Sequence, residues 1–406
     1  MEGPKHRGDV SPPTDWEPRS RAVLQNYGAV CDQMRLECPV AFSEYLGWSL
    51  FRHEDICRVL KDTATFSNVV SAHLTVPNGM DPPLHTKYRR IIEPYFSAAR
   101  MERFEPVCRE VAVRCVESLP SNGEVDLSEK FARKFALDVQ CAFAGWPTEV
   151  RDRLQLWMAE NHRATLAGDR EASSRLATEF AVYVTELLAQ RRIEPQDDVT
   201  TLLLKETVDG RLLTDDEIVS ILRNWTVGEL GTIASAVGIL VHYLCQDQVL
   251  QARLRRRPEE LSVAIEEILR LDAPLLSNRR KVLRSVKIGE RELEPGARVA
   301  LMWGSANRDE AVFCEAAQLR LERSQDQNLL YGAGIHVCPG APLARLELRV
   351  VLECLLAGTV ELKLSHQQVP IRAIYPAAGF ATLPIVVERC QTPDERVDRS
   401  LFPSGG

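Results

Sequence analysis

The sequence predicts a mainly α-helical protein of the α+β class, in which small β-sheets accompany a majority of helices. Several long segments carry apolar residues at spacings of three and four, which is typical of amphipathic helices. The chain has 406 residues, of which 45% are hydrophobic and 26% are charged, so it is large enough to enclose a cofactor. The predicted helices cover residues 105–119, 149–165, 173–192, 214–247, 259–271 and 341–357.

The longest predicted helix, 214–247, begins with a capping box. Thr214 and Glu217 satisfy each other's backbone N–H groups in such a box, and an acidic first turn suits the helix dipole. Gly228, Gly231 and Gly238 lie inside this helix, and each costs about 1 kcal/mol relative to alanine. Either another helix packs closely against these glycines, or they make room for a bound cofactor.

Short β-structure is predicted between the last two long helices. Residues 286–296 predict a β-hairpin with turns at Gly289 and Gly296, and residues 299–303 predict the apolar strand that follows. The chain has no internal repeat or low-complexity tract. The sheets are therefore expected to be small additions to a helical protein.

Charge and cysteine usage exclude several classes of protein. The formal net charge of −7 gives no electrostatic reason to bind nucleic acid. The 11 cysteines follow no regular spacing and are expected to be reduced thiols of a cytoplasmic protein. No stretch approaches about 18 uninterrupted apolar residues, so we expect no membrane span.

The most informative stretch is the glycine-rich loop 331–340, which places Cys338 directly before the predicted helix 341–357. A helix N-terminus directs free N–H groups and a partial positive charge at such a thiol, which favours the thiolate. No second cysteine lies within four positions, so the spacings of zinc sites are not met. A single axial thiolate on haem iron is the better match, although most isolated cysteines are small buried hydrophobes.

The pattern G-x-G-x-H-x-C-x-G, followed by A-P-L-A-R, resembles the haem-binding loop of the cytochrome P450 family, specifically of its soluble bacterial members. The resemblance implies a long central helix over haem b (iron protoporphyrin IX), with small β-sheets. It makes Cys338 the axial ligand and His336 a partner of a haem propionate. Gly332 and Gly340 shape the loop.

The haem loop departs from the usual family version at two positions. Tyr331 stands where Phe is common, and Pro339 has no N–H to offer the neighbouring sulfur. Hydrogen bonds to the sulfur are therefore expected from Gly340 and beyond, with an effect on the redox potential.

The resemblance also sets the expected domain organisation, because it extends from about residue 39 to about residue 387. We expect one haem-thiolate oxygenase domain at 21–390. A polar, proline-bearing and flexible arm is expected at 1–20, and a short tail at 391–406.

Residues 227–232, Val-Gly-Glu-Leu-Gly-Thr, resemble the family's oxygen-binding groove, in which a small residue precedes an acid–threonine pair. The resemblance makes Gly228 the small residue and Thr232 the hydroxyl that stabilises oxygen and relays protons. Gly231 replaces the acid expected beside the threonine. Glu229 lies on adjoining helix surface and is expected to connect solvent protons to Thr232 through water, unless it is a solvated or ion-paired glutamate.

Haem carries two carboxylates, which need cationic or hydrogen-bonding partners when buried. By the same resemblance, His85 and Arg89 lie four residues apart on one helix face and bind propionates. Arg280 matches the strand arginine with the same role, although the adjacent Arg279 leaves a shift of one residue open. His336 completes the expected set.

Glu267 and Arg270 form the pattern E-x-x-R, which resembles the family's structural ion pair. Exposed pairs at this spacing contribute less than about 1 kcal/mol, but this one precedes the haem loop as the family order requires. An arginine from a later loop joins the pair in the family. Gln318 occupies that position here, so we expect a hydrogen-bonded variant of the triad.

The residues expected around the substrate are mostly apolar or small, which favours a small hydrophobic or aromatic molecule held by shape. Ser277 and Asn278 are candidates for a directing hydrogen bond. All of these residues could instead belong to the core. The expected apolar lining consists of Val69, Val70, Leu74, Val227, Leu275, Leu276 and Phe380.

The expected activity is that of a haem-thiolate monooxygenase, which inserts one oxygen atom of O2 into its substrate. Electrons are expected from a ferredoxin or flavodoxin with its NAD(P)H-dependent reductase, or from a module beyond Gly406, because the tail is too short for a redox domain. Arg345 and Arg349 offer a basic patch for an acidic donor, unless they are solvated helix charges. Peroxide-driven oxidation, suggested by Gly231, and a non-catalytic haem sensor are the alternatives.

Overall fold

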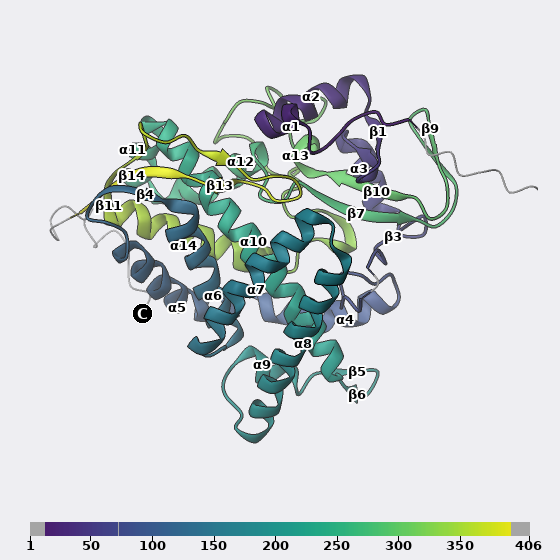
Figure 1. Ribbon diagram of the computed structural model, residues 1–406, viewed down its shortest axis with the longest axis horizontal. Helices are drawn as coiled ribbons and strands as arrows, with labels where there is room; N and C mark the ends of the chain where they lie inside the picture. Colours follow the sequence, from purple (N-terminus) through teal and green to yellow (C-terminus); the bar gives the residue numbers. More distant parts are fainter. Residues whose placement is uncertain (1–12, 72, 391–406) are drawn as a thin grey trace, which may run out of the picture.

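The predicted mainly α fold is confirmed by the computed structural model, which describes residues 13–71 and 73–390. Helix α10 (Asp215–Gln246) runs through the molecule, with most helices around it and the larger sheet towards the upper right (Figure 1). Short helices are α1 (Arg21–Gln25), α9 (Val199–Leu203) and α13 (Trp303–Ala306). The longer helices are α2 (Tyr27–Glu37), α3 (His53–Lys61), α4 (Leu84–Ile92), α5 (Ala98–Glu117), α6 (Arg133–Ala144), α7 (Thr148–Ala167), α8 (Arg170–Ile193), α11 (Gln248–Arg256), α12 (Leu261–Leu271) and α14 (Ala341–Gly358).

Helix α10 begins and ends at the predicted residues. The Thr214 hydroxyl accepts from the Glu217 N–H, and the Glu217 carboxylate accepts from the Thr214 N–H at 2.7 Å. Asp247 follows the last turn and caps α11 in turn. Within the described chain α10 alone is long and apolar enough to cross a membrane, but half of its most apolar window is buried inside the protein, as in the core helix of a globular protein.

The largest sheet contains five strands in the order β1-β2-β10-β7-β3. Strands β2 and β10 are parallel, and the other neighbours are antiparallel. This sheet brings the chain after α12 next to the segment before α4, because β7 pairs with β3. Its strands are β1 (Val40–Ser43), β2 (Gly47–Leu50), β10 (Arg298–Met302), β7 (Ser277–Val282) and β3 (Phe66–Ser67).

The predicted hairpin forms between β8 (Val286–Ile288) and β9 (Arg291–Leu293). Gly289 and Gly296 adopt φ of 55° and 88°, which glycine accepts without the strain of a side chain. The predicted strand 299–303 corresponds to β10, and Trp303 already begins α13. The remaining sheets are β11 (Thr359–Leu364) with β14 (Pro384–Arg389) and β4 (Asn122–Asp126), β12 (Ile371–Arg372) with β13 (Phe380–Thr382), and β5 (Thr207–Val208) with β6 (Arg211–Leu212).

The expected N-terminal arm, 1–20, packs onto the folded body where the structure describes it. Residues 1–12 and the expected tail 391–406 lie outside the described residues. Trp16, in contrast, is buried and meets Phe51 edge to face, while Asp15 pairs with Arg291 at 2.9 Å. The part of the arm from residue 15 therefore packs onto the protein, because its one tryptophan reaches an apolar cluster.

The Glu267–Arg270 pair is fully buried, and its arginine partner differs from the expected position. Arg323 donates to Glu267 at 3.0 Å and supplies the third member of the triad. The side chain of Gln318 instead contacts Glu315, and only its carbonyl accepts from Arg270. The expectation of a glutamine variant was wrong, because a loop connects Gln318 to Arg323 and lets the later residue turn inward.

Candidate functional site

The loop before α14 holds Cys338 by backbone geometry. Cys338 N–H donates to the Tyr331 carbonyl at 2.8 Å, which closes the loop. Gly332 and Gly334 adopt φ of 72° and 71°, in the left-handed region that favours glycine. A Cβ at Gly334 would also lie 2.9 Å from the Leu60 carbonyl oxygen, so the close approach to the end of α3 needs glycine.

Two backbone N–H groups serve the Cys338 sulfur, and they come from the predicted positions. The N–H groups of Gly340 and Ala341 lower the pKa of the thiol, although desolvation by the protein atoms around the sulfur outweighs them and raises the pKa of Cys338. By accessible surface the residue is exposed, so the sulfur is crowded by the loop without being enclosed. Pro339 has no N–H to contribute. A metal cation is therefore the partner that would hold this sulfur as a thiolate.

Four predicted haem contacts meet beside this loop. The ring centroids of His85, from α4, and His336 lie 4.2 Å apart. Burial lowers the pKa of His336 to about 3, with His85, Arg280 and Arg89 adding electrostatic repulsion. Arg280 of β7 is buried, which lowers its pKa to about 10, whereas the adjacent Arg279 is exposed. Burial thus decides between the two arginines.

This cluster has more donors than acceptors. Both ring nitrogens of His85 and Nε2 of His336 are buried without a hydrogen-bond partner in the described chain. Asp81 lies near Arg280, but its carboxylate already accepts from the Ser67 hydroxyl at 2.5 Å and from the Asn68 N–H at 2.9 Å. Arg89 pairs with Glu93 at 2.8 Å, so the unused groups are the histidine nitrogens and the buried charge of Arg280. These groups fit a ligand that brings carboxylates, as haem does.

Sequence reasoning missed one member of this cluster. The side-chain amide of Asn68, which follows β3, lies 3.0 Å from Nδ1 of His336 and fixes the ring. No pattern around residue 68 indicated this role, because the contact joins segments that are far apart in the chain.

The three glycines of α10 have two different environments: two face open space, as room for a cofactor requires, and one packs against other residues. A Cβ at Gly228 or Gly231 would meet no heavy atom within 4 Å, so both glycines face open space. A Cβ at Gly238 would lie 3.9 Å from Phe380 and Ser128, which is ordinary packing. The Thr232 hydroxyl donates to the Gly228 carbonyl at 2.5 Å and so lies against the same part of the helix.

The Glu229 carboxyl lies within hydrogen-bonding reach of Glu347 on α14. It forms no ion pair with a described residue, and its Oε1 is buried, so neither the solvated nor the ion-paired alternative describes it. Glu347 was missed by sequence reasoning. The sequence does contain a signal for Glu347. It lies at helical spacing from Leu343 and Val350, so an acidic residue stands on the apolar, buried face of α14.

The expected substrate-lining residues separate into two groups. Val69, Val70, Leu74, Val227 and Leu275 are between 41% and 50% exposed, although each is a large apolar side chain, as expected for the wall of an open cavity. Leu276 and Phe380 are instead buried in core clusters. The Ser277 hydroxyl is bonded to Tyr375, and Asn278 accepts from the Arg279 N–H.

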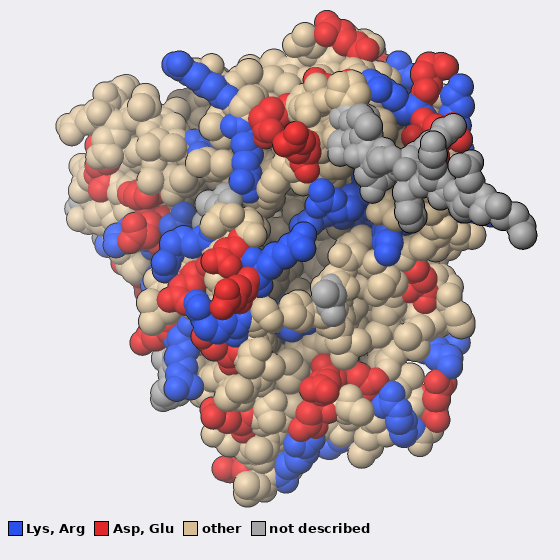
Figure 2. Space-filling view, turned by 45° about the vertical axis from the view of Figure 1, so that its right-hand side comes forward, with Lys and Arg blue, Asp and Glu red and all other residues tan. Residues whose placement is uncertain are grey.

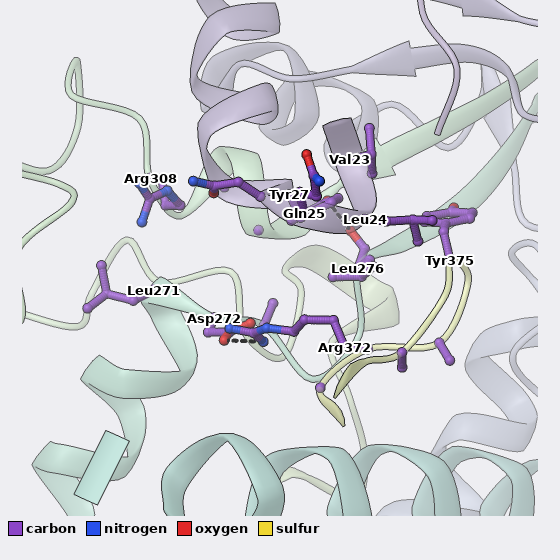
Figure 3. Close-up of a pocket in the computed structure, with 18 of the residues that line it drawn as sticks. Val23, Leu24, Gln25, Tyr27, Leu271, Asp272, Leu276, Arg308, Arg372 and Tyr375 are labelled. Carbon is purple, nitrogen blue, oxygen red and sulfur yellow. Dashed lines mark hydrogen bonds and ion pairs between the residues drawn. The ribbon is translucent and has the colours of Figure 1, made fainter. Parts of the chain in front are cut away.

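Leu276 lines a cavity of ≈ 190 Å³ (Figure 3). The cavity lies among the first two helices, the chain after α12 and residues 372–379. An ion pair between Asp272 and Arg372, at 2.6 Å, lies at this cavity. Leu276 is therefore one wall of this cavity as well as part of a core cluster.

Both arginines of the predicted basic patch on α14 are engaged. Arg345 pairs with Glu266 at 2.7 Å and lies over the Tyr331 ring, 4.4 Å from its centroid. Arg349 pairs with Glu105 and Glu353. Basic and acidic side chains also alternate on the face drawn in Figure 2, which is hollowed near its centre.

Comparison with known proteins agrees with this geometry. A sequence model of the family described as Cytochrome P450 matches residues 259–385. Mycinamicin IV hydroxylase/epoxidase of Micromonospora griseorubida is 30% identical over 80% of this chain and 85% of that protein. Linalool 8-monooxygenase of Pseudomonas putida is 30% identical over 76% of this chain and 82% of that protein.

The fold agrees as well. The solved structure of a cytochrome P450 from Chondromyces apiculatus has a TM-score of 0.84 and 26% identity, and the match covers 92% of this chain and 98% of that one. Relatives named for hydroxylation and monooxygenation favour oxygenation over the sensor and peroxide alternatives. The chain therefore belongs to the cytochrome P450 family and is a haem-dependent monooxygenase.

Proposed function

We propose that this monooxygenase binds haem b through Cys338 and oxidises a small hydrophobic molecule in the open space that Gly228 and Gly231 face. The observation that carries the proposal is the cluster of His85, Arg89, Arg280 and His336 beside the Cys338 loop. Buried nitrogens of this cluster lack an anionic partner. Two propionates would supply anionic acceptors for these nitrogens and for Arg280, while Arg89 already pairs with Glu93 at 2.8 Å.

The axial role of Cys338 is tested by spectroscopy. Reduced, carbon-monoxide-treated protein is expected to show the red-shifted absorption typical of a haem thiolate, and Cys338→Ala is expected to lose it. Cys314→Ala is the matched control, because Cys314 is an exposed free thiol. A Cys338→Ala spectrum like that of the unchanged protein would contradict the proposal.

Thr232 and Glu229 are proposed to manage protons. The Thr232 hydroxyl lies on α10 one turn beyond Gly228, at the edge of the open space, and Glu229 follows Gly228 directly. Haem supplies the oxygen chemistry when bound, whereas these side chains hold or move protons. Thr232→Ala and Glu229→Gln are expected to lower the fraction of electrons that reach product. Full coupling in both variants would remove the relay.

The substrate is proposed to be held by shape. The partly exposed apolar residues around the space offer few fixed polar contacts, and the Ser277 hydroxyl already binds Tyr375. The named substrates of two relatives, mycinamicin IV and linalool, support an organic substrate. A library screened for the low-to-high-spin shift of the ferric Soret band identifies the class, and no shift with any apolar compound would contradict it.

The electron donor is proposed to be a ferredoxin or flavodoxin with its NAD(P)H-dependent reductase, in the cytoplasm. Residues 21–390 are proposed to act as one oxygenase domain, since the helical part and the larger sheet both contribute haem contacts. Reconstitution with purified donors of each class, with product formation as the readout, tests the pairing.

A further inference from the structure

A buried pair of carboxyl groups connects the two helices that flank the haem site. Glu229 belongs to α10, three residues before Thr232, and Glu347 belongs to α14, which follows Cys338. The two carboxyl groups lie within hydrogen-bonding reach of each other. Glu347 is fully buried, at 0% exposure.

The pair has no donor if both groups are ionised. Oε1 of Glu229 and both carboxyl oxygens of Glu347 are buried without a hydrogen-bond donor in the described part of the chain. A carboxylate only accepts hydrogen bonds, whereas a carboxylic acid also donates one. A single proton between the two groups therefore satisfies the pair.

Among residues 13–71 and 73–390, the titratable groups that interact with the pair are Cys108 of α5 and Tyr331 and Cys338 of the haem loop. None of these three is a cation that could take the place of the proton. Two carboxylates cannot both remain ionised without a cation in such a site. Glu347 is the more deeply buried of the two, since it is fully buried whereas Glu229 is partly exposed, so the shared proton belongs on Glu347. The raised pKa of Glu347 agrees, and its causes are burial first and the Glu229 carboxyl second.

Arg109 of α5, which interacts with Cys108, is already engaged. Arg109 binds Glu105 at 2.8 Å and Glu353 at 2.7 Å, and both of these acids belong to the ion-pair network that also holds Arg349. Arg109 therefore neutralises acids of this network and leaves the buried pair with one negative charge.

We propose that Glu229 and Glu347 share one proton, with Glu347 as its carrier, and that the remaining negative charge lowers the reduction potential of the haem iron. The proposal rests on the haem thiolate at Cys338. The charge of Glu229 acts on the Cys338 sulfur, and in a poorly solvated site a nearby negative charge disfavours the gain of an electron. Glu347 is a positioning residue that acts on the site through Glu229, and the charge of Glu229 adds an electrostatic effect to its proposed role with Thr232.

Two isosteric variants separate the proton from the charge. In Glu229→Gln, the amide carbonyl accepts from the protonated Glu347, so the proton stays and the charge is lost. In Glu347→Gln, the amide N–H donates to the Glu229 carboxylate, so the charge stays and the proton is lost. A structural role alone would not divide the two effects in this way.

The measurements are made on the haem-loaded enzyme. Infrared difference spectra between H2O and D2O are expected to show the C=O band of a buried carboxylic acid in the unchanged enzyme and in Glu229→Gln, but not in Glu347→Gln. Spectroelectrochemistry is expected to show a higher reduction potential in Glu229→Gln and an unchanged potential in Glu347→Gln. Glu290→Gln is the control, because this side chain is 95% exposed and solvent screens its charge.

A second control addresses the neighbouring phenol. The Tyr331 hydroxyl is buried and has no hydrogen-bond partner among the residues that the structure describes, so Tyr331→Phe is expected to leave the C=O band in place. Loss of the band in Tyr331→Phe, or its persistence in Glu347→Gln, would overturn the shared proton. Equal potentials in Glu229→Gln and the unchanged enzyme would overturn the electrostatic role.

An experiment can contradict the shared proton without contradicting haem binding at Cys338. The carbon-monoxide spectrum of the unchanged enzyme reports only on thiolate ligation, and it stays intact if the pair lacks the proposed proton. If Glu229→Gln does not bind haem, the C=O band of the unchanged enzyme and its loss in Glu347→Gln still decide the protonation state.

Discussion

Burial distinguishes the two adjacent arginines, Arg279 and Arg280, that could bind the cofactor. Arg280 points inward from β7 and is 4% exposed, whereas Arg279 is exposed. Arg280→Leu should weaken haem retention about 30-fold or more, because loss of one partner of a buried charge pair costs about 2–5 kcal/mol. The rate of haem transfer to an apo-globin measures retention. Arg279→Leu is the matched control, and equal losses in both variants would contradict the assignment.

Glu347 makes stability depend on pH in a direction opposite to that of an ordinary carboxylate. Its pKa is raised in the folded protein, so the native state binds more protons than the unfolded state above the usual carboxyl range. The contribution is present at acidic pH and is lost as pH rises towards the folded pKa. The free energy of unfolding should fall there by at most about 1.4 kcal/mol per pH unit.

Glu347→Gln should remove this fall, because an amide does not titrate. Chemical denaturation at several pH values between 5 and 8, about the range where globular proteins are most stable, provides the test. Glu290→Gln should retain the slope of the unchanged protein. A slope that survives in Glu347→Gln would assign the pH dependence to another group.

At the scale of elements, the buried Glu267 joins α12 to the loop that precedes the haem loop. Its carboxylate accepts from Arg270 and Arg323 and from the backbone N–H of Arg320. Arg323→Leu should lower the free energy of unfolding by about 1.5–3 kcal/mol, since hydrogen bonds to charged groups contribute that much. Urea denaturation measures the change.

Gln318→Ala is the informative companion to that variant. The Gln318 side chain contacts only the exposed Glu315 among the described hydrogen bonds, so its loss should cost no more than about 0.5 kcal/mol. A larger effect of Gln318→Ala than of Arg323→Leu would restore the glutamine to the triad.

The sequence predicts where helix α10 begins but not what packs against it. The capping box and the acidic first turn predict its beginning at Asp215, and glycine inside the helix lowers its stability relative to alanine. Helix propensity does not distinguish the glycine that packs against other residues, Gly238, from the two that face open space, Gly228 and Gly231. That division depends on Phe380 and Ser128, which approach Gly238 from other parts of the chain.

At the scale of the whole molecule, surface charge should govern reduction by a protein donor. Arg345 is partly neutralised by Glu266. Glu266→Gln should free this arginine and raise the rate of reduction by an acidic ferredoxin, with a steeper dependence on salt. Stopped-flow reduction at several ionic strengths measures both quantities.

Arg345→Gln should have the opposite effect on the rate and should flatten the salt dependence. Glu290→Gln again serves as a control for net charge, since it removes one charge from the hairpin turn between β8 and β9. Salt-independent rates in all three variants would exclude electrostatic docking at Arg345.

The sequence by itself determined the helical class, the long central helix and the loop that presents Cys338, because local spacing, caps and glycines encode these features. Tertiary structure decided the roles that depend on segments far apart in the chain. It placed Arg323 against Glu267, Trp16 in the core, and Glu347 beside Glu229. Burial and the supply of hydrogen-bond donors choose between such candidates, and both arise only when distant elements pack together.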